Sequence, residues 1–330
     1  MDFLIGIDGG GTKTVGVLTD LSGTLLACRF TGASNPNDVT LPVSVDRLHE
    51  LCRGLLQDAG LPDSILPNLS VFGGIAGGIN HGPHLEAALR ERMPGVGRLT
   101  IRSDIHILLT GELPTGDGAC IICGTGSACF LRRCKDIIRI GGWGYLLDSG
   151  GSGYDIGRDA LEAALRAFDG RGEPTRLTDL LTAHLGGAVQ TRITEIYNEG
   201  KPYIAACAPL VFKAAEEGDE VAEAILMRNA RKLAEYVEAA WSWETAEGRT
   251  PPEDFPVVMG GGISVKQAPR WQERILSLTP THIPLRLTVA TMPPVYGAVV
   301  EALMQTEKPC DEAHLSSLRS RFLEGYGKHA

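Results

Sequence analysis

A run of glycines near the amino terminus carries residues that could bind an anion. The segment GIDGGGTKT, residues 6–14, contains the candidate ligands Gly10, Gly11, Thr12 and Lys13. Glycine leaves its backbone N–H groups open to close approach, and the threonine hydroxyl and lysine ammonium add donors for phosphate oxygens. The segment is not a P-loop, because Thr12 separates Gly11 from Lys13, and Thr14 stands where a dinucleotide fingerprint needs glycine. We therefore predict a phosphate-binding hairpin, with a purely structural turn as the alternative.

Asp8 precedes this hairpin at the end of a predicted strand. Hard cations prefer carboxylate and water oxygens as ligands. Asp8 is therefore our candidate for holding Mg²⁺ through water, and the alternative role of its side chain is to cap the turn.

Two further glycine turns follow predicted strands. CGTGS, residues 123–127, offers Gly124, Thr125 and Gly126, and MGGGI, residues 259–263, offers Gly261 and Gly262. The first would act as a second phosphate turn, and the second would let a nucleoside approach the backbone. A single glycine hairpin is often only a turn, whereas the three together indicate a polyphosphate nucleotide as the ligand.

The elements that must position these turns alternate between strands and helices. Short strands are predicted at residues 3–8, 13–19, 24–30, 69–75 and 99–102, and again at 119–123, 127–131, 136–140, 255–259 and 286–290. Helices are predicted at residues 43–59, 83–91, 294–304 and 311–324, and across much of 152–247. Both halves open with three strands and a glycine turn. We therefore predict two related α/β domains, residues 1–116 with a carboxyl-terminal helix at about 305–330, and residues 117–304.

Composition narrows the class of protein. The 330 residues are 43% hydrophobic and 22% charged, with a formal net charge of −9, which suits a globular chain of two domains. An acidic chain argues against nucleic acid as a partner, and no run reaches the roughly 18 apolar residues of a membrane span. The amino terminus lacks a signal-peptide pattern, so a cytoplasmic protein with reduced cysteines is expected.

The eight cysteines lack the spacing of a metal site. Cys120 and Cys123 lie three apart on a predicted strand and so point to opposite faces. Cys129 and Cys134 complete no familiar cluster pattern, and we expect structural thiols instead. The histidines of NHGPH, residues 80–84, are predicted to lie on the surface of a loop.

The order of the motifs resembles a known fold. GIDGGGTKT, CGTGS, MGGGI and PPVYGAVVEA, residues 293–302, look like the two phosphate loops, the adenosine loop and the connecting helix of the actin-like ATPase fold. Sugar kinases, Hsp70 and actin share that fold. More narrowly, residues 141–161 and 213–226 resemble the BadF/BadG/BcrA/BcrD family, which includes N-acetylglucosamine kinase and bacterial glucosamine kinases. The resemblance implies an α/β fold of two RNase H-like domains with an interdomain cleft for nucleotide and sugar.

The resemblance also implies roles for single residues. Asp104 follows the predicted strand at 99–102, where the family places a general-base Asp, and the alternative is a helix N-cap at Ser103 or Asp104. The implied sugar-binding residues are Asn35, with Asn37 as a fallback, and Gly77, Asp104, Thr125, Trp143 and Asp148. Ordinary turn chemistry is the alternative for the asparagines. Trp143 would form an apolar wall for the sugar, or else belong to the core.

One segment departs from the family's pattern. The kinases usually read Gly-Asp-Glu-Gly-Ser or Ser-Asp-Gln-Gly-Ser where this chain reads Asp148-Ser149-Gly150-Gly151-Ser152. Their sugar-binding Asp therefore falls on Ser149, and Asp148 stands one place earlier. We expect Asp148 to take over the role, or the segment to select a different sugar.

The implied activity is phosphorylation of an amino sugar by ATP and Mg²⁺ in a homodimer. N-acetylglucosamine, giving the 6-phosphate, is the expected substrate, with glucosamine or N-acetylmuramic acid as alternatives. The same family contains ATPases that activate 2-hydroxyacyl-CoA dehydratases or benzoyl-CoA reductase, and this is the second hypothesis. A sugar-sensing repressor or a chaperone-like ATPase would need a DNA-binding or peptide-binding segment, and no part of the sequence suggests one.

Overall fold

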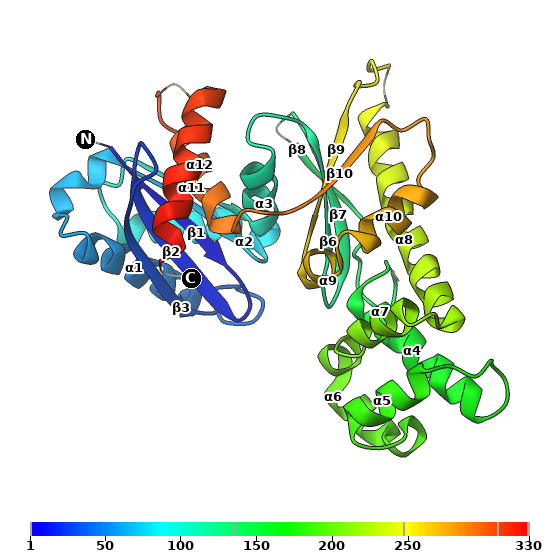
Figure 1. Ribbon diagram of the computed structural model, residues 1–330. Coiled ribbons are helices and arrows are strands. Elements are labelled where there is room, and N and C mark those ends of the chain that lie inside the picture. Colours follow the sequence, from blue (N-terminus) through cyan, green and yellow to red (C-terminus); the bar gives the residue numbers. More distant parts are fainter. Residues whose placement is uncertain (1, 135, 149, 247, 309, 329–330) are drawn as a thin grey trace. The chain divides into compact units, whose positions relative to one another are not determined.

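The computed structural model divides into two compact units (Figure 1). It describes residues 2–134, 136–148, 150–246, 248–308 and 310–328. Unit 1 consists of residues 1–116 together with 291–330, and unit 2 consists of residues 117–290. Each unit contains a five-stranded sheet covered by helices, so the predicted α/β fold class is confirmed.

Unit 1 is built on a mixed sheet in the order β3-β2-β1-β4-β5. Its strands are β1 (Phe3–Gly9), β2 (Lys13–Asp20), β3 (Leu25–Gly32), β4 (Leu69–Ile75) and β5 (Arg98–Ser103). The first three form an antiparallel meander, whereas β1, β4 and β5 run parallel. Gly9 pairs with Ile75, and Ile75 pairs with Ser103. The carboxyl ends of the three parallel strands therefore meet at one edge of the sheet.

Helices cover both faces of this sheet because its central strands are apolar on both sides. Ile5 and Ile7 of β1 pack with helices α1 (Leu41–Asp58) and α2 (Gly78–Arg92). Leu4, which directly precedes Ile5, packs on the opposite face with α11 (Pro294–Met304) and α12 (Glu312–Tyr326). Alternate residues of a strand point to opposite faces. Strand β1 therefore lies between two hydrophobic cores, one on each face of the sheet. The short 3-10 helix Asp63–Asn68 leads into β4.

Residues 291–304 lie in unit 1, although the sequence analysis placed them in the second domain. Helix α3 (Asp104–Glu112) packs along α11. Glu112 also accepts hydrogen bonds from the backbone N–H groups of Thr291 and Met292, at 2.5 and 2.6 Å. These contacts tie the returning chain to unit 1 before α11 begins. Sequence reasoning could not find the boundary because it depends on contacts between residues far apart in the chain.

Unit 2 repeats the same strand plan in the order β10-β9-β6-β7-β8. Its strands are β6 (Gly118–Cys123), β7 (Ser127–Arg133), β8 (Asp136–Ile140), β9 (Phe255–Gly260) and β10 (Leu285–Val289). Again three strands form a meander, and β6 runs parallel to β9 and β9 to β10. The helices are α4 (Gly153–Phe168), α5 (Leu177–Leu185), α6 (Ile193–Ala205), α7 (Ala208–Glu216), α8 (Glu220–Glu244), α9 (Gly262–Gln267) and α10 (Arg270–Leu278), with a 3-10 turn at Val189–Thr191.

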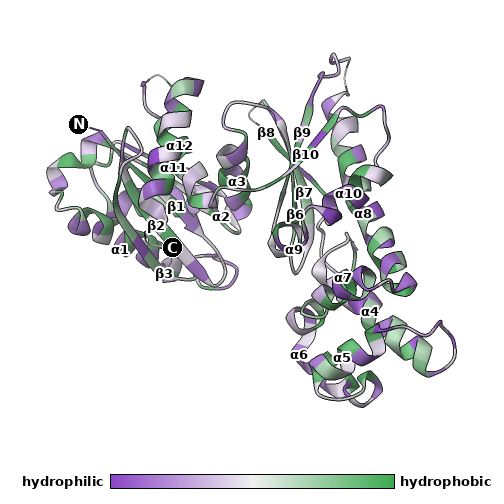
Figure 2. Cartoon of the chain, viewed as in Figure 1, coloured by the Kyte–Doolittle hydropathy of each residue, from purple (hydrophilic) through white to green (hydrophobic). Residues whose placement is uncertain are grey.

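The long helix α8 shows why unit 2 packs as it does. Its buried residues include Ala222, Leu226, Leu233 and Val237, which recur at helical spacing. They join one hydrophobic core with the strands and with the helices α4, α7 and α10. The mixture of hydrophobic and hydrophilic residues around α8 can be followed in Figure 2. This helix lies within residues 152–247, where the sequence predicted mainly helical structure.

The segment at residues 80–84 is helical, so its prediction as a loop was wrong. It forms part of α2, which begins at Gly78 and contains Gly82 and Pro83. Glycine and proline lower helix propensity, which hid this start from sequence reasoning. Gly82 is needed here because a Cβ atom would lie 2.9 Å from the Ile101 carbonyl oxygen.

Gly297 provides a test of the contact that holds α3 against α11. A Cβ atom at Gly297 would lie 1.7 Å from the Ile107 carbonyl oxygen, so the two helices would have to separate. We expect Gly297→Ala to lower the free energy of unfolding by about 3 kcal/mol, measured by urea denaturation. Gly116→Ala is the control, since no atom lies within 4 Å of its added Cβ. Equal midpoints for the two variants would contradict the packing described.

Candidate functional site

Two acidic side chains stand at the carboxyl edge of the parallel strands in unit 1. Asp8 is the penultimate residue of β1, and Asp104 directly follows β5 as the first residue of α3. The register of β1, β4 and β5 brings these strand ends to the same edge. Sequence reasoning proposed both residues separately, and the topology accounts for their being neighbours.

Burial raises the pKa values of both members of this acidic pair, and the charge of Asp104 adds to the shift of Asp8. The pKa of Asp8 is raised to about 6, first by burial and then by the charge of Asp104, while Lys13 opposes the shift. Burial also raises the pKa of Asp104, although hydrogen bonds from Ser103 and Ile105 counteract it. No hydrogen bond from the described residues reaches the Asp8 carboxylate. A buried carboxylate without donors is costly unless a cation or a proton neutralises it.

The N-cap of α3 is Ser103. Its hydroxyl oxygen accepts a hydrogen bond from the Ile105 N–H at 3.2 Å and its O–H donates to Asp104 Oδ1 at 3.0 Å. The Asp104 carboxylate also accepts from Ile105 N at 3.1 Å, through the same Oδ1 atom. Both hydrogen bonds to the Asp104 carboxylate end on Oδ1, so its other oxygen has no side-chain or neighbouring-residue donor among the described residues.

The glycine hairpin after β1 leaves donors open. Gly10 is used internally, because its N–H donates to the Lys13 carbonyl and its carbonyl accepts from Ser34 N, both at 3.0 Å. In the described part of the chain, the N–H groups of Gly11 and Thr12 have no partner. Both residues are exposed, as is Lys13. The donors that this hairpin leaves open are therefore those of Gly11, Thr12 and Lys13, whereas Gly10 shapes the turn.

The predicted sugar residue Asn35 lies in a compact polar cluster of unit 1. Its amide Nδ2 donates to Asp38 Oδ2 at 2.6 Å, and its Oδ1 accepts from Asn37 N at 3.0 Å. Gly77 lies against this cluster with a positive φ of 81°, and a Cβ there would lie 2.6 Å from Asn35 Oδ1. Only glycine suits this position. Asn35 and Gly77 are thus brought together.

Two members of the same neighbourhood were missed from the sequence. Asp38 approaches the hairpin, since a Cβ at Gly11 would lie 2.5 Å from its Oδ2. His81, in the first turn of α2, places Nε2 3.3 Å from Asn37 Oδ1. The dense asparagine and aspartate content of SNPND signals a turn, but nothing in it indicated that α2 would supply a histidine.

In unit 2 the second and third glycine turns come together. The Gly124 N–H donates to the Gly126 carbonyl at 2.9 Å, closing the β6–β7 hairpin. Gly261 has φ of 91°, and a Cβ there would lie 2.5 Å from the Cys123 carbonyl oxygen. The backbone of Gly261 and Gly262 therefore lies directly beside the second turn, which agrees with a shared role in binding a nucleotide.

The start of α4 holds the second turn in place. The N–H groups of Gly153 and Tyr154 donate to the carbonyls of Gly124 and Thr125, at 2.7 and 3.2 Å. Ser152 caps the same helix, with Asp155 completing a capping box. These two carbonyl oxygens therefore already accept hydrogen bonds from α4. Their partial negative charge is partly offset by the N-terminus of the helix, so the hairpin repels an anion less.

Trp143 and Asp148 delimit an exposed loop in unit 2. The Trp143 side chain is 62% exposed, so the core alternative was wrong. Its ring lies under the Arg139 guanidinium at 4.5 Å. Asp148 closes the loop, because its Oδ2 accepts from Trp143 N at 3.2 Å and its N–H donates to the Gly144 carbonyl at 2.8 Å. Ser149, on which the family's sugar-binding Asp falls, lies outside the described residues.

The cysteines of β6 and β7 are free thiols. Cys120 and Cys123 are buried free thiols on β6. Within the described residues, no group of three or more histidine, cysteine or acidic side chains could hold a metal ion. No helix in that part of the chain is both long and apolar enough to cross a membrane.

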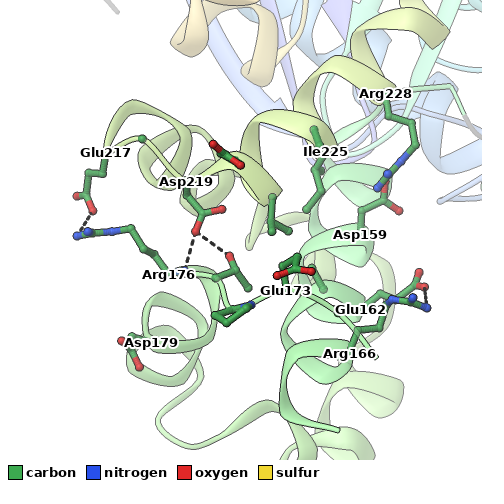
Figure 3. Close-up of a pocket in the computed structure, with 18 residues that line it drawn as sticks. Asp159, Glu162, Arg166, Glu173, Arg176, Asp179, Glu217, Asp219, Ile225 and Arg228 are labelled. Atoms are coloured by element: carbon green, nitrogen blue, oxygen red, sulfur yellow. Dashed lines mark hydrogen bonds and ion pairs between the residues drawn. The ribbon is translucent and has the colours of Figure 1, made fainter. Parts of the chain in front are cut away.

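A pocket of about 1250 Å³ lies elsewhere in unit 2, among α4, α5 and α8 (Figure 3). Its lining contains seven acidic side chains and three arginines, and each arginine forms an ion pair with one of the acids. Arg176 pairs with Glu217 at 2.6 Å, and Arg228 with Asp159 at 3.3 Å. Asp219 accepts a hydrogen bond from the Arg176 N–H, and it caps α8 by accepting another from the Ala222 N–H. None of the candidate site residues lines this pocket.

Known proteins with similar sequences carry the names of sugar kinases. An N-acetylmuramic acid/N-acetylglucosamine kinase of Clostridium acetobutylicum is 35% identical over 240 residues, covering 71% of this chain and 77% of the relative. An N-acetyl-D-glucosamine kinase of Dictyostelium discoideum is 29% identical over 274 residues, covering 79% of this chain and 85% of the relative.

The fold agrees with these likenesses. The ROK hexokinase of Thermus thermophilus superposes with a TM-score of 0.58 over 92% of this chain and 98% of its own, at 16% identity. At that identity the likeness concerns the fold, and it confirms the actin-like class expected from the motifs. The model of the BadF/BadG/BcrA/BcrD ATPase family matches residues 5–302, and the chain belongs to this family.

Proposed function

We propose that this chain transfers the γ-phosphate of ATP to a hydroxyl group of an amino sugar. The observation that carries the proposal is the partly buried pair Asp8 and Asp104, set at one sheet edge beside a hairpin with open backbone donors. Phosphoryl transfer needs positioned donors, a cation and a base near the attacking hydroxyl. The similar kinases support the acceptor class.

Asp104 is proposed as the general base. The Ser103 and Ile105 hydrogen bonds orient one carboxylate oxygen and leave the other available. That oxygen would accept the hydroxyl proton as the sugar oxygen attacks phosphorus. The raised pKa brings the base closer to neutral pH, which strengthens proton acceptance.

Asp8 fits a divalent cation. Its carboxylate is partly buried, receives no hydrogen bond from the described residues, and stands beside a second acid, so it favours a positive charge nearby. We propose that Asp8 holds Mg²⁺ through water, because hard cations prefer oxygen ligands. When bound, the ion would offset the charge of the phosphates. Gly11, Thr12 and Lys13 would contact the same phosphates directly, and Gly10 would maintain the turn.

The remaining candidate residues divide between nucleotide and sugar. Gly124, Thr125 and Gly126 are proposed to bind phosphate oxygens, and Gly261 and Gly262 to accommodate adenosine. Asn35, Gly77, Thr125, Trp143 and Asp148 are proposed to contact the sugar. N-acetylglucosamine, giving its 6-phosphate, is the proposed substrate. N-acetylmuramic acid is the main competitor, because the Clostridium acetobutylicum relative is named for both sugars.

The first test is ADP release with MgATP against hexoses, hexosamines, N-acetylhexosamines and N-acetylmuramic acid. We expect N-acetylglucosamine to stimulate release at least tenfold over ATP alone, since a kinase couples turnover to its acceptor. Glucose is the control acceptor. ATP turnover indifferent to every sugar would overturn the kinase proposal and favour the ATPase-activator hypothesis.

Asp104→Asn tests the general base. Loss of the proton acceptor should lower kcat by about 10²–10⁴-fold, while the Kd for ATP changes little. In the unaltered protein, activity should fall as the pH drops below the raised pKa of Asp104, because only the ionised form accepts a proton. Asp46→Asn, at an exposed ion pair with Arg92, is the control. A kcat within twofold of the unaltered protein would remove Asp104 from this role.

Asp8→Asn tests the electrostatic cost of the acidic pair in nucleotide-free protein with chelator. The pKa of Asp8 in the folded protein, about 6, exceeds the ordinary aspartate value of 3.8. The folded state therefore binds the proton more tightly, and Asp8 lowers stability as pH rises from about 4 to 6 and above. We expect the variant to be more stable by on the order of 2 kcal/mol at pH 8 and unchanged at pH 4. Equal stability at both pH values would contradict the assignment.

A further inference from the structure

Lys201 occupies an unusual place in unit 2. It follows Gly200, whose φ of 69° and ψ of −148° interrupt α6 and redirect the chain. Pro202 comes next, so Lys201 stands at the start of the second helical segment of α6. Glycine allows this reversal and proline suits the first turn of the segment that follows.

Close packing fixes this segment against α4. The two helices are in contact, and a Cβ at Gly157 would lie 2.0 Å from the Ile204 carbonyl oxygen. The second half of α6 therefore rests directly on the backbone of α4. Because α4 also holds the second glycine turn through Gly153 and Tyr154, Lys201 and that turn are positioned by the same helix.

The ammonium group of Lys201 lies beside the second glycine turn. Its Nζ is 3.1 Å from the position that a Cβ of Gly126 would occupy. The same Nζ atom lies over the ring of Tyr145, 5.3 Å from the ring centroid. Among the described residues, no carboxylate forms an ion pair with Lys201. The positive charge is thus directed at a hairpin whose Gly124 and Thr125 carbonyls are already satisfied by α4.

We propose that Lys201 binds a phosphate oxygen of the nucleotide at the Gly124–Gly126 turn. This inference rests on the proposed function and adds a cation that sequence reasoning did not identify. A lysine ammonium on a flexible stem acts as a point charge for phosphate. Tyr145 holds the ammonium in place by a cation–π contact and leaves its remaining donors free for the phosphate. Lys201 serves the turn in unit 2 as Lys13 serves the hairpin in unit 1.

The test compares ligands that differ in phosphate content. Kd values for ATP, ADP and adenosine are measured by calorimetry for the unaltered protein and for Lys201→Met, Lys201→Gln and Lys201→Arg. We expect the two neutral variants to bind ATP and ADP at least about tenfold more weakly, with adenosine within twofold. Lys201→Arg, which keeps the charge, should recover most of the affinity. Lys232→Met, at an exposed ion pair on α8, is the matched control.

A structural role for Lys201 predicts a different pattern. If the lysine only supported the loop through Tyr145, adenosine binding would fall together with ATP binding in the two neutral variants. That result would overturn the inference, as would unchanged ATP affinity in both neutral variants. ATP binding that depends on Lys201 without any sugar-stimulated turnover would uphold the inference and reject the kinase. Failure of the unaltered protein to bind ATP or ADP would reject both.

Discussion

The repulsion between two partly buried carboxylates is the constraint on which the candidate site of unit 1 depends. Asp8 and Asp104 share the carboxyl edge of three parallel strands, where burial and the charge of Asp104 raise the pKa of Asp8 to about 6. Such a pair destabilises the folded protein at neutral pH, and the cation proposed to bind there would relieve the repulsion. The packing of α11 against α3 and β1 keeps the acids together. The two acids for which chemical roles are proposed thus lower the stability of the folded protein.

Glycine has a second role in this protein besides offering free N–H groups. At Gly77, Gly261 and Gly157 a Cβ would meet another atom at 2.6, 2.5 and 2.0 Å respectively. Each contact joins a candidate functional segment to a rigid element. The glycine-rich motifs therefore act partly by close packing, which brings segments distant in the sequence within reach of one another. Gly10 illustrates the difference, because its own N–H is used within the hairpin.

Local patterns predicted most of the fold and part of the site. The turns after β1, β6 and β9 were found because glycine and strand periodicity are both local signals, and Asp8 and Asp104 follow from strand ends. Asp38, His81 and Lys201 were missed because their relevance arises only when α2 and α6 fold against other elements. Gly82 and Pro83 concealed the start of α2, and long-range contacts with α3 decided where residues 291–304 belong. Local sequence patterns do not reveal which residues far apart in the chain lie close together in the fold.

If the loop at residues 143–148 contacts the sugar as proposed, the choice of sugar depends on the conformation of this loop. Asp148 already accepts the Trp143 N–H at 3.2 Å, so one of its oxygens is engaged in closing the loop. For Asp148 to bind a sugar hydroxyl with that oxygen, the loop must open, whereas its other oxygen could bind with the loop closed. An exchange of one hydrogen bond for another changes the free energy only modestly. The fit of the sugar's acyl substituent beside the exposed Trp143 ring would then decide which sugar is accepted. Asp148 stands one place earlier than the sugar-binding Asp of the family's pattern. This displacement would then change the specificity for the sugar without abolishing function.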